Sequence, residues 1–146
     1  MVLGLESRER SPIEEIHWKG PFVSKSVLID THIFLWILTQ SRRLKELRWL
    51  GDYPYWTVSP VSLLEMAFLH ECGKISIELT PLIQKLSRDA RFKLDNVSLE
   101  EVCLAAMGVS WTRDPFDRLL VAHSMIRSLP LGTCDEQIRQ KYPAVV

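Results

Sequence analysis

The sequence predicts a single three-layer α/β/α domain, with a central parallel sheet of four to five strands between two layers of helices. Short apolar runs rich in β-branched residues alternate along the chain with segments of helical periodicity. Several of those segments begin with a capping residue followed by proline, which marks the start of a helix. Because this alternation is typical of crossover connections, we expect the strands to run parallel.

The composition is that of a globular protein without a strong net charge. At 146 residues the chain is long enough for one domain with a real core, and its 18 Lys and Arg residues balance 18 Asp and Glu residues. No basic field therefore predicts tight non-specific binding to a nucleic acid. Three cysteines without Cys-x-x-Cys spacing argue against disulfides and zinc. With no membrane-length apolar run and no signal-peptide core, we expect a cytoplasmic protein.

Residues 1–24 are expected to form an N-terminal extension outside the main domain, which we place at residues 25–146. The extension is polar and contains two glycines and two prolines, with room for a short helix near residues 13–18. An interaction arm and a gene start placed too far upstream both fit this composition.

The first predicted strand, residues 27–29, ends on the carboxylate of Asp30. Its apolar residues predict a strand buried on both faces, and the apolar run at 33–38 predicts a buried helix behind it. Asp30 is therefore expected at the carboxyl edge of the sheet, where ligands bind in open α/β folds. An aspartate after a strand is also a common helix cap, so Asp30 alone establishes no site.

Leucines at positions 44, 47 and 50 recur among charged residues and predict an amphipathic surface helix. Its apolar face can pack on the sheet or contact another protein. Tyr55–Val58 is the second strand by composition.

The dipeptide Ser59-Pro60 predicts a helix that runs to about residue 72. Glu65 shares one face of that helix with apolar positions 61, 68 and 72. If this face points inward, the carboxylate needs a cation or strong donors, because an isolated buried charge is costly. If the apolar stripe is offset, Glu65 lies at its solvent edge, and the pattern leaves both interpretations open.

Two further helices flank a third strand around Phe92–Leu94. Thr80-Pro81 predicts the start of the first helix, with Leu82, Ile83 and Leu86 as its apolar positions. The second helix begins at Ser98, whose spacing to Glu101 is that of a capping box, and ends near residue 107.

The segment Arg113-Asp114-Pro115-Phe116-Asp117-Arg118-Leu119-Leu120 predicts another capped helix. We interpret Asp114 as the cap, which leaves Asp117 in the first turn with no capping role to explain it. Residues 119, 122 and 126 are the expected buried stripe. Residues 129–133 predict a fourth strand that ends close to Asp135, and residues 142–146 can supply a fifth.

Four carboxylates distant in the sequence are therefore expected at one edge of the sheet: Asp30, Glu65, Asp117 and Asp135. Such a cluster repels itself strongly without a cation. Oxygen ligands without a His or Cys set favour Mg²⁺ or Mn²⁺ over zinc. Hard cations of this kind suit phosphodiester hydrolysis, because they activate water and stabilise the leaving oxygen.

At these positions the chain resembles PIN domains, and more narrowly VapC, the toxin of VapBC toxin–antitoxin systems. The resemblance covers about residues 26–146, and the block at 113–120 is its most specific part. The matching segments are Leu28-Ile29-Asp30-Thr31-His32, the helix from Ser59-Pro60 to Glu65, the 113–120 block, and Thr133-Cys134-Asp135-Glu136. Gly132 and Cys134 depart from the family pattern, which often has a β-branched residue and a basic or polar one there, and this predicts a looser fourth strand.

The resemblance implies a Mg²⁺- or Mn²⁺-dependent endoribonuclease of the prokaryotic cytoplasm, acting on structured RNA such as tRNA or rRNA. It also implies a VapB-like antitoxin and a homodimer. Carried over by position, the catalytic and metal-binding acids are Asp30, Glu65, Asp117 and Asp135, with Asp135 serving a second metal or acting through water. Thr133 becomes a hydrogen-bonding neighbour and Asp114 a peripheral acid.

Several other residues can serve the site or the fold. Thr31 and His32 follow the first strand, and His32 can contact a phosphate or cap locally. Arg113 and Arg118 can hold RNA phosphates or form ion pairs with neighbouring acids. His123 has no partner at ligand spacing and is treated as ordinary. Three rival interpretations remain: a binding or scaffold module with a degraded site, a nuclease acting on DNA or in RNA processing, and acids that only cap helices.

Overall fold

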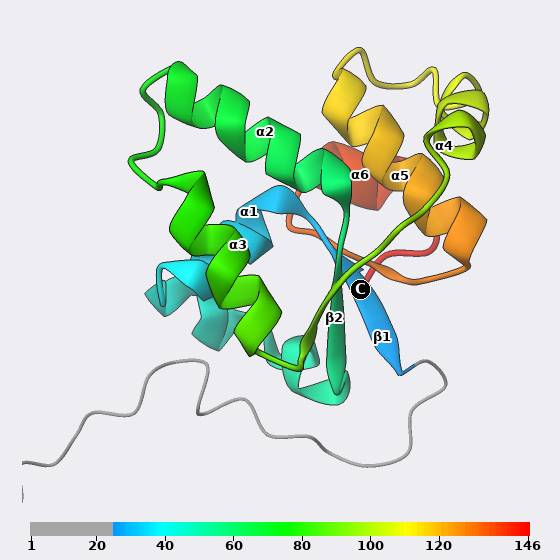
Figure 1. Ribbon diagram of the computed structural model, residues 1–146. Helices are drawn as coiled ribbons and strands as arrows, with labels where there is room; N and C mark the ends of the chain where they lie inside the picture. The colour runs from blue at the N-terminus through cyan, green and yellow to red at the C-terminus, as the bar shows by residue number, and fades with distance from the viewer. Residues whose placement is uncertain (1–24) are drawn as a thin grey trace, which may run out of the picture.

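The structure is a computed structural model that describes residues 25–146, and the predicted extension at 1–24 lies outside the described residues. Its centre is a parallel four-stranded sheet in the order β3-β2-β1-β4, with helices on both faces (Figure 1). This confirms the predicted three-layer fold. The strands are β1 (Ser26–Ile29), β2 (Tyr55–Val58), β3 (Phe92–Leu94) and β4 (Leu131–Gly132).

The register brings the ends of the three neighbouring strands β2, β1 and β4 level. Ile29, the last residue of β1, pairs with Val58 on one side and with Gly132 on the other. The residues that follow these three strand ends, Asp30, Ser59 and Thr133, therefore emerge at the same edge of the sheet. This edge is the one at which ligands bind in parallel α/β folds.

Hydrophobic packing divides the helices between the two faces of the sheet. Val27 and Ile29 point into a cluster with α1, α2 and α3, whereas Leu28 points into a second cluster with α5 and α6. A third cluster joins α4 to α5. None of the described helices is long and apolar enough to cross a membrane. The helices are α1 (Thr31–Leu38), α2 (Pro60–Glu71), α3 (Leu79–Arg88), α4 (Leu99–Ala106), α5 (Pro115–Arg127) and α6 (Glu136–Lys141).

The prediction of an amphipathic surface helix around residues 44–50 is wrong. The chain instead forms two 3₁₀ helices, η1 (Arg42–Glu46) and η2 (Arg48–Asp52). Leu44, Leu47 and Leu50 are buried in the main core. Their strict three-residue spacing matches the period of a 3₁₀ helix, and this spacing is what places all three on the sheet side.

Of the two interpretations left open for α2, the structure supports the offset apolar stripe. The buried positions are Ser62 and Met66, while Phe68 is 48% exposed and Cys72 is exposed. The stripe is thus offset by one position, and Glu65 lies at its edge. Helix α3 begins at Leu79 with Glu78 as its cap, so the predicted Thr80-Pro81 start falls inside the first turn. Proline is tolerated there because the first N–H groups have no partner within the helix.

The carboxyl-terminal part differs from the prediction in three details. Strand β4 spans two residues, and the predicted fifth strand is a single parallel bridge between Leu131 and Val145. The buried face of α5 is wide, running from Leu120 to Ser124, and Leu119 and Ile126 pack only partly buried beside α4.

Candidate active site

The four predicted acids meet in one pocket of about 130 Å³. Each comes from a different part of the fold: the end of β1, the second turn of α2, the first turn of α5 and the turn into α6. The pocket is lined by Asp30, Thr31, His32, Glu65, Asp114, Asp117, Leu120, Asp135 and Ile138. The structure therefore brings together every acid that the sequence places at the site, including the peripheral Asp114.

Asp30 is the most deeply buried of these acids, with 6% of its surface exposed. One carboxylate oxygen accepts the N–H of Ile33 at 2.8 Å and so caps α1. Burial raises the pKa of Asp30, and hydrogen bonds from the Thr133 hydroxyl and from Ile33 partly oppose that rise. The backbone N–H of Asp30 donates to the carbonyl of Gly132 at 3.0 Å, which joins β1 to β4 beside the pocket.

Glu65 is oriented by Thr31. The Thr31 hydroxyl donates to the Glu65 carboxylate and lies 3.1 Å from the Ser62 hydroxyl one turn earlier on α2. Burial raises the pKa of Glu65, while the hydrogen bond from Thr31 lowers it. Thr31 thus connects the start of α1 to α2 at the rim of the pocket, which assigns this residue a structural contact that the sequence did not predict.

Asp117 has a strongly perturbed carboxylate. Burial raises its pKa to about 7, and the negative charges of Asp114, Asp135, Glu65 and Asp30 add to the rise. The helix cap cannot explain its position, because Asp114 already accepts the N–H groups of Phe116 and Asp117. A carboxylate with this pKa is a candidate functional group.

Asp135 is exposed, and it caps α6 by accepting the N–H of Ile138 at 2.8 Å. Its own N–H donates to the Thr133 hydroxyl at 3.0 Å, so the fully buried Thr133 links Asp135 to Asp30. The capping interpretation therefore describes Asp30, Asp114 and Asp135 correctly. It does not account for Glu65 and Asp117.

The donor set fits a hard divalent cation. Four carboxylates face one small pocket, and hard oxygen ligands are those that Mg²⁺ and Mn²⁺ prefer. Among residues 25–146, no three His, Cys, Asp or Glu side chains lie close enough together to hold a metal ion directly. Mg²⁺ commonly binds through one or two carboxylates and keeps several waters, so this spacing is compatible with it.

The basic residues near the pocket differ in their contacts. His32 is exposed and lines the pocket, and Arg113 is exposed at the start of the α5 segment. The Arg118 side chain donates to the carbonyl of Thr112 at 2.7 Å, which steadies the turn before α5. Within residues 25–146, neither arginine forms an ion pair with an acid.

His123 is a residue that sequence reasoning missed. The sequence gives it no partner, yet it is fully buried and bonded to Ser59 and Asp95, which lie far from it in the sequence. A histidine among Leu120, Val121 and Ala122 was the available signal, because a polar ring in an apolar stripe requires hydrogen-bonding partners.

Comparisons with known proteins agree with this fold. A chain of a toxin–antitoxin complex from Klebsiella pneumoniae has a TM-score of 0.62 at 19% sequence identity, covering 82% of this chain and 95% of that chain. At this identity the likeness concerns the fold alone. No match was found among curated proteins. The family model of the PIN domain matches residues 27–142, which is most of the chain. The chain therefore belongs to the PIN-domain family.

Proposed function

We propose that this protein is a Mg²⁺- or Mn²⁺-dependent endoribonuclease and the VapC-like toxin of a type II toxin–antitoxin pair. PIN domains are nucleases, and membership of that family supports a hydrolase acting on phosphodiester bonds. The observation that carries the proposal is the pocket itself, which is lined by four acids from separate elements. Burial and mutual repulsion raise the pKa of Asp117 to about 7, and a bound cation would offset both.

The acids have different proposed roles. Asp30, Glu65 and Asp117 hold the cation or orient its waters, because they are the partly or fully buried members of the set. Asp135 is exposed and acts through water or at a second metal. A bound Mg²⁺ or Mn²⁺ would supply an activated water and neutralise charge on the phosphate. Thr31 and Thr133 keep the carboxylates of Glu65 and Asp30 in place.

RNA is the proposed substrate, with tRNA or rRNA as the expected class. His32 lines the pocket and Arg113 is exposed next to the start of α5, so both are available to phosphates. Within the described part of the chain, Arg118 uses one guanidinium nitrogen to bond the Thr112 carbonyl, and we assign its other nitrogens the same role as those of Arg113.

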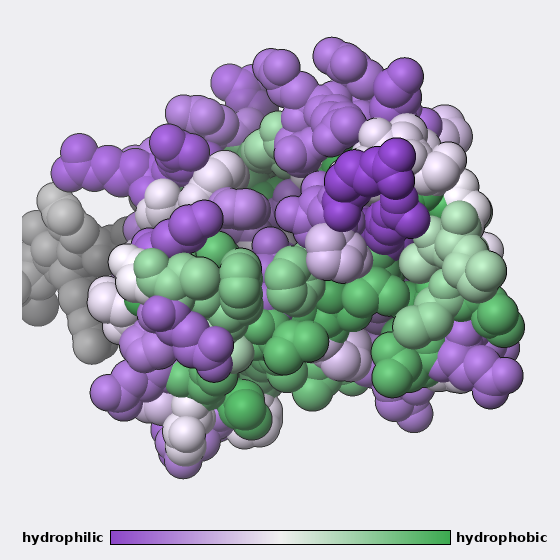
Figure 2. All heavy atoms as spheres, turned by 90° about the horizontal axis from the view of Figure 1, so that it is seen from above, coloured by the Kyte–Doolittle hydropathy of each residue, from purple (hydrophilic) through white to green (hydrophobic). Residues whose placement is uncertain are grey.

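The proposed partner is a VapB-like antitoxin in the prokaryotic cytoplasm, and we also expect a homodimer. Large apolar side chains are exposed on α2 and α4, and Figure 2 shows a broad hydrophobic band across the face seen from above. Exposed patches of this kind mark interaction surfaces in globular proteins. The exposed large apolar residues are Leu64 and Phe68 on α2, Leu99 and Leu104 on α4, and Met107 at the C-cap of α4.

Purified protein is expected to cut a structured RNA pool with Mg²⁺ or Mn²⁺ and to be inactive in EDTA. Asp30→Asn should abolish the cutting and keep the fold, because asparagine still caps α1 but loses the charge that a cation requires. Gel analysis of the cleaved pool measures this. Asp52→Asn, the same change outside the pocket, is the matched control and should cut like the wild type.

Two results would count against the proposal. Full cleavage by a folded Asp30→Asn variant would remove Asp30 from the site. A folded wild-type protein, free of antitoxin, that neither cuts RNA nor binds Mn²⁺ would favour a binding or scaffold module. Cleavage of DNA in preference to RNA would support the nuclease but exclude the proposed substrate.

A further inference from the structure

A buried hydrogen-bonded chain connects three segments behind the acidic pocket. His123 of α5 has one ring nitrogen, Nδ1, 2.9 Å from the Ser59 hydroxyl. Its other ring nitrogen, Nε2, lies 2.7 Å from the Asp95 carboxylate. Ser59 and His123 are both fully buried, so water does not compete for these bonds.

The contacts and the burial of the ring together indicate the protonation state of the histidine. The ionised Asp95 carboxylate can only accept, so Nε2 carries a hydrogen and donates it to Asp95. In the neutral ring Nδ1 has no hydrogen and accepts from the Ser59 hydroxyl, whose oxygen also accepts the N–H of Val61 as the cap of α2. Burial lowers the pKa of His123, although the bond to Asp95 opposes this, and the neutral ring matches the arrangement.

The order serine–histidine–aspartate is that of a nucleophilic hydrolase site, but the geometry excludes this chemistry. The Ser59 side chain is wholly enclosed and occupied in capping α2, so no substrate carbonyl can reach its oxygen. The hydrogen bonds among Ser59, His123 and Asp95 therefore have a structural role and not a nucleophilic one.

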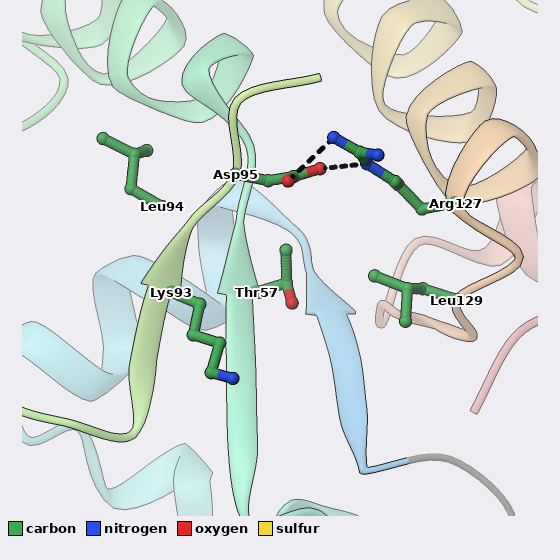
Figure 3. Close-up of a pocket in the computed structure, with 6 residues that line it drawn as sticks. All are labelled: Thr57, Lys93, Leu94, Asp95, Arg127 and Leu129. Carbon is green, nitrogen blue, oxygen red and sulfur yellow. Dashed lines mark hydrogen bonds and ion pairs between the residues drawn. The ribbon is translucent and has the colours of Figure 1, made fainter.

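Asp95 is a fixed anchor for His123. The backbone N–H of Asp95 donates to the carbonyl of Val58 at the end of β2. Its carboxylate receives two hydrogen bonds from Arg127, at 2.7 and 3.1 Å, and both residues line a cavity of about 290 Å³ (Figure 3). Burial raises the pKa of Asp95, but the bonds from Arg127 and His123 outweigh burial and lower it below its ordinary value. His123 thus hydrogen-bonds to a charged group tied to the sheet.

The hydrogen bonds of His123 to Ser59 and Asp95 help to fix the two helices that carry Glu65 and Asp117. His123 of α5 meets Ser59 at the start of α2, and Phe116 at the start of α5 meets Phe68 farther along α2, with ring centroids 5.9 Å apart. The helices therefore pass each other in opposite directions with a contact at either end. Glu65 lies between the two contact positions on α2, and Asp117 lies between them on α5.

We propose that His123 is a positioning residue, which sets the separation of Glu65 and Asp117 by fixing α5 to the cap of α2 and to Asp95. The inference rests on the proposed metal-dependent nuclease. Residues that hold ligand-bearing elements in place commonly change metal affinity or activity when they are replaced.

The test compares two substitutions of His123 in the full chain. His123→Leu removes both hydrogen bonds at similar volume, whereas His123→Gln keeps one donor and one acceptor. We expect His123→Leu to weaken Mn²⁺ binding, followed by electron paramagnetic resonance, and to lower kcat, each by about tenfold or more. KM for RNA should change by less than about twofold, because His123 touches no substrate. His123→Gln should recover most of both losses.

Ser124→Ala is the matched control. Ser124 is the next residue of α5, is also fully buried, and bonds to the Leu129 carbonyl and the Tyr142 hydroxyl instead of to α2. It should lose stability but keep Mn²⁺ affinity and kcat. If His123→Leu does not fold, Ser59→Gly removes the same bond at a cap position that tolerates glycine, and should show the same losses.

The outcomes separate this inference from the proposed function. Wild-type Mn²⁺ binding and cleavage that persist unchanged in folded His123→Leu or Ser59→Gly would overturn the positioning role alone. Equal losses in Ser124→Ala would also overturn it, because they would follow from stability. A wild-type protein with neither Mn²⁺ binding nor cleavage would overturn the proposed function and this role with it.

Discussion

Asp117→Asn is expected to abolish RNA cleavage and, at the same time, to stabilise the metal-free protein at pH 8. Cleavage should fall by at least about 100-fold, because the variant lacks a charge that the cation requires. The gain in stability follows from the pKa of Asp117, which burial and the neighbouring acids raise from 3.8 to about 7. A substitution that lowers the activity of a protein and raises its stability identifies a residue that serves function at the expense of stability.

The stability gained by Asp117→Asn should increase as the pH rises, because the wild-type protein loses stability over the same range. Between about pH 3.8 and 7, the folded protein holds a proton on Asp117 that the unfolded chain has released. Stability is therefore greatest at the acid end of this window and is lost as the pH rises through it. Because the side chain is only half-buried, solvent screening reduces the effect to about 1 kcal/mol.

Urea denaturation in EDTA at pH 5 and pH 8 measures this prediction. The wild-type protein should lose stability relative to Asp117→Asn on going to pH 8, and saturating Mg²⁺ should reverse the order. Glu71→Gln, an exposed acid on α2 outside the pocket, should show neither effect. Identical denaturation midpoints for wild type and Asp117→Asn at pH 8 would show that the pocket carries no electrostatic penalty.

Gly132→Val is expected to destabilise the protein by about 3 kcal/mol, because strand β4 has no room for a side chain there. A Cβ atom on Gly132 would lie 2.2 Å from Cη2 and 2.8 Å from Cζ3 of the Trp49 indole. The indole would have to leave its position beside Tyr53, and β4 would shift at the carbonyl that accepts the Asp30 N–H. RNA cleavage should therefore fall together with stability.

A double substitution tests the cause. Trp49→Leu removes the overlapping ring atoms, so Gly132→Val should cost at least about 1 kcal/mol less in that background than in the wild type. Denaturation of the four proteins of this cycle gives the difference directly. Additive losses would mean that the cost of Gly132→Val has another origin.

Helix starts and strand ends were the part of the fold that the sequence predicted well. Ser59, Ser98 and Asp114 cap their helices as expected, since each cap is a local pattern of a polar residue at a fixed distance from its backbone donors. The apolar runs at β1 and β2 predicted these two strands equally well. Right-handed crossover topology then placed Asp30 and Asp117 at the same edge of the sheet, where both line the pocket.

Features that depend on neighbours distant in the sequence were not predictable in this way. The indole of Trp49 occupies the space that a side chain at Gly132 would need, and nothing in the sequence near either residue indicates this contact. The three-residue spacing of the leucines at 44, 47 and 50 fits an amphipathic α-helix as well as a 3₁₀ helix, and the sequence does not show that all three are buried in the core. His123 looked ordinary because its partners, Ser59 and Asp95, are 64 and 28 residues away along the chain.

The most direct test of the central claim, that the acids form one cation site, is a Mn²⁺ titration followed by electron paramagnetic resonance. The wild type and Asp52→Asn should bind Mn²⁺ alike, whereas Asp30→Asn and Asp117→Asn should each bind at least about tenfold more weakly. The two variants lie on different elements, so a joint loss requires a shared site. Equal Mn²⁺ binding by all four folded proteins would contradict the claim.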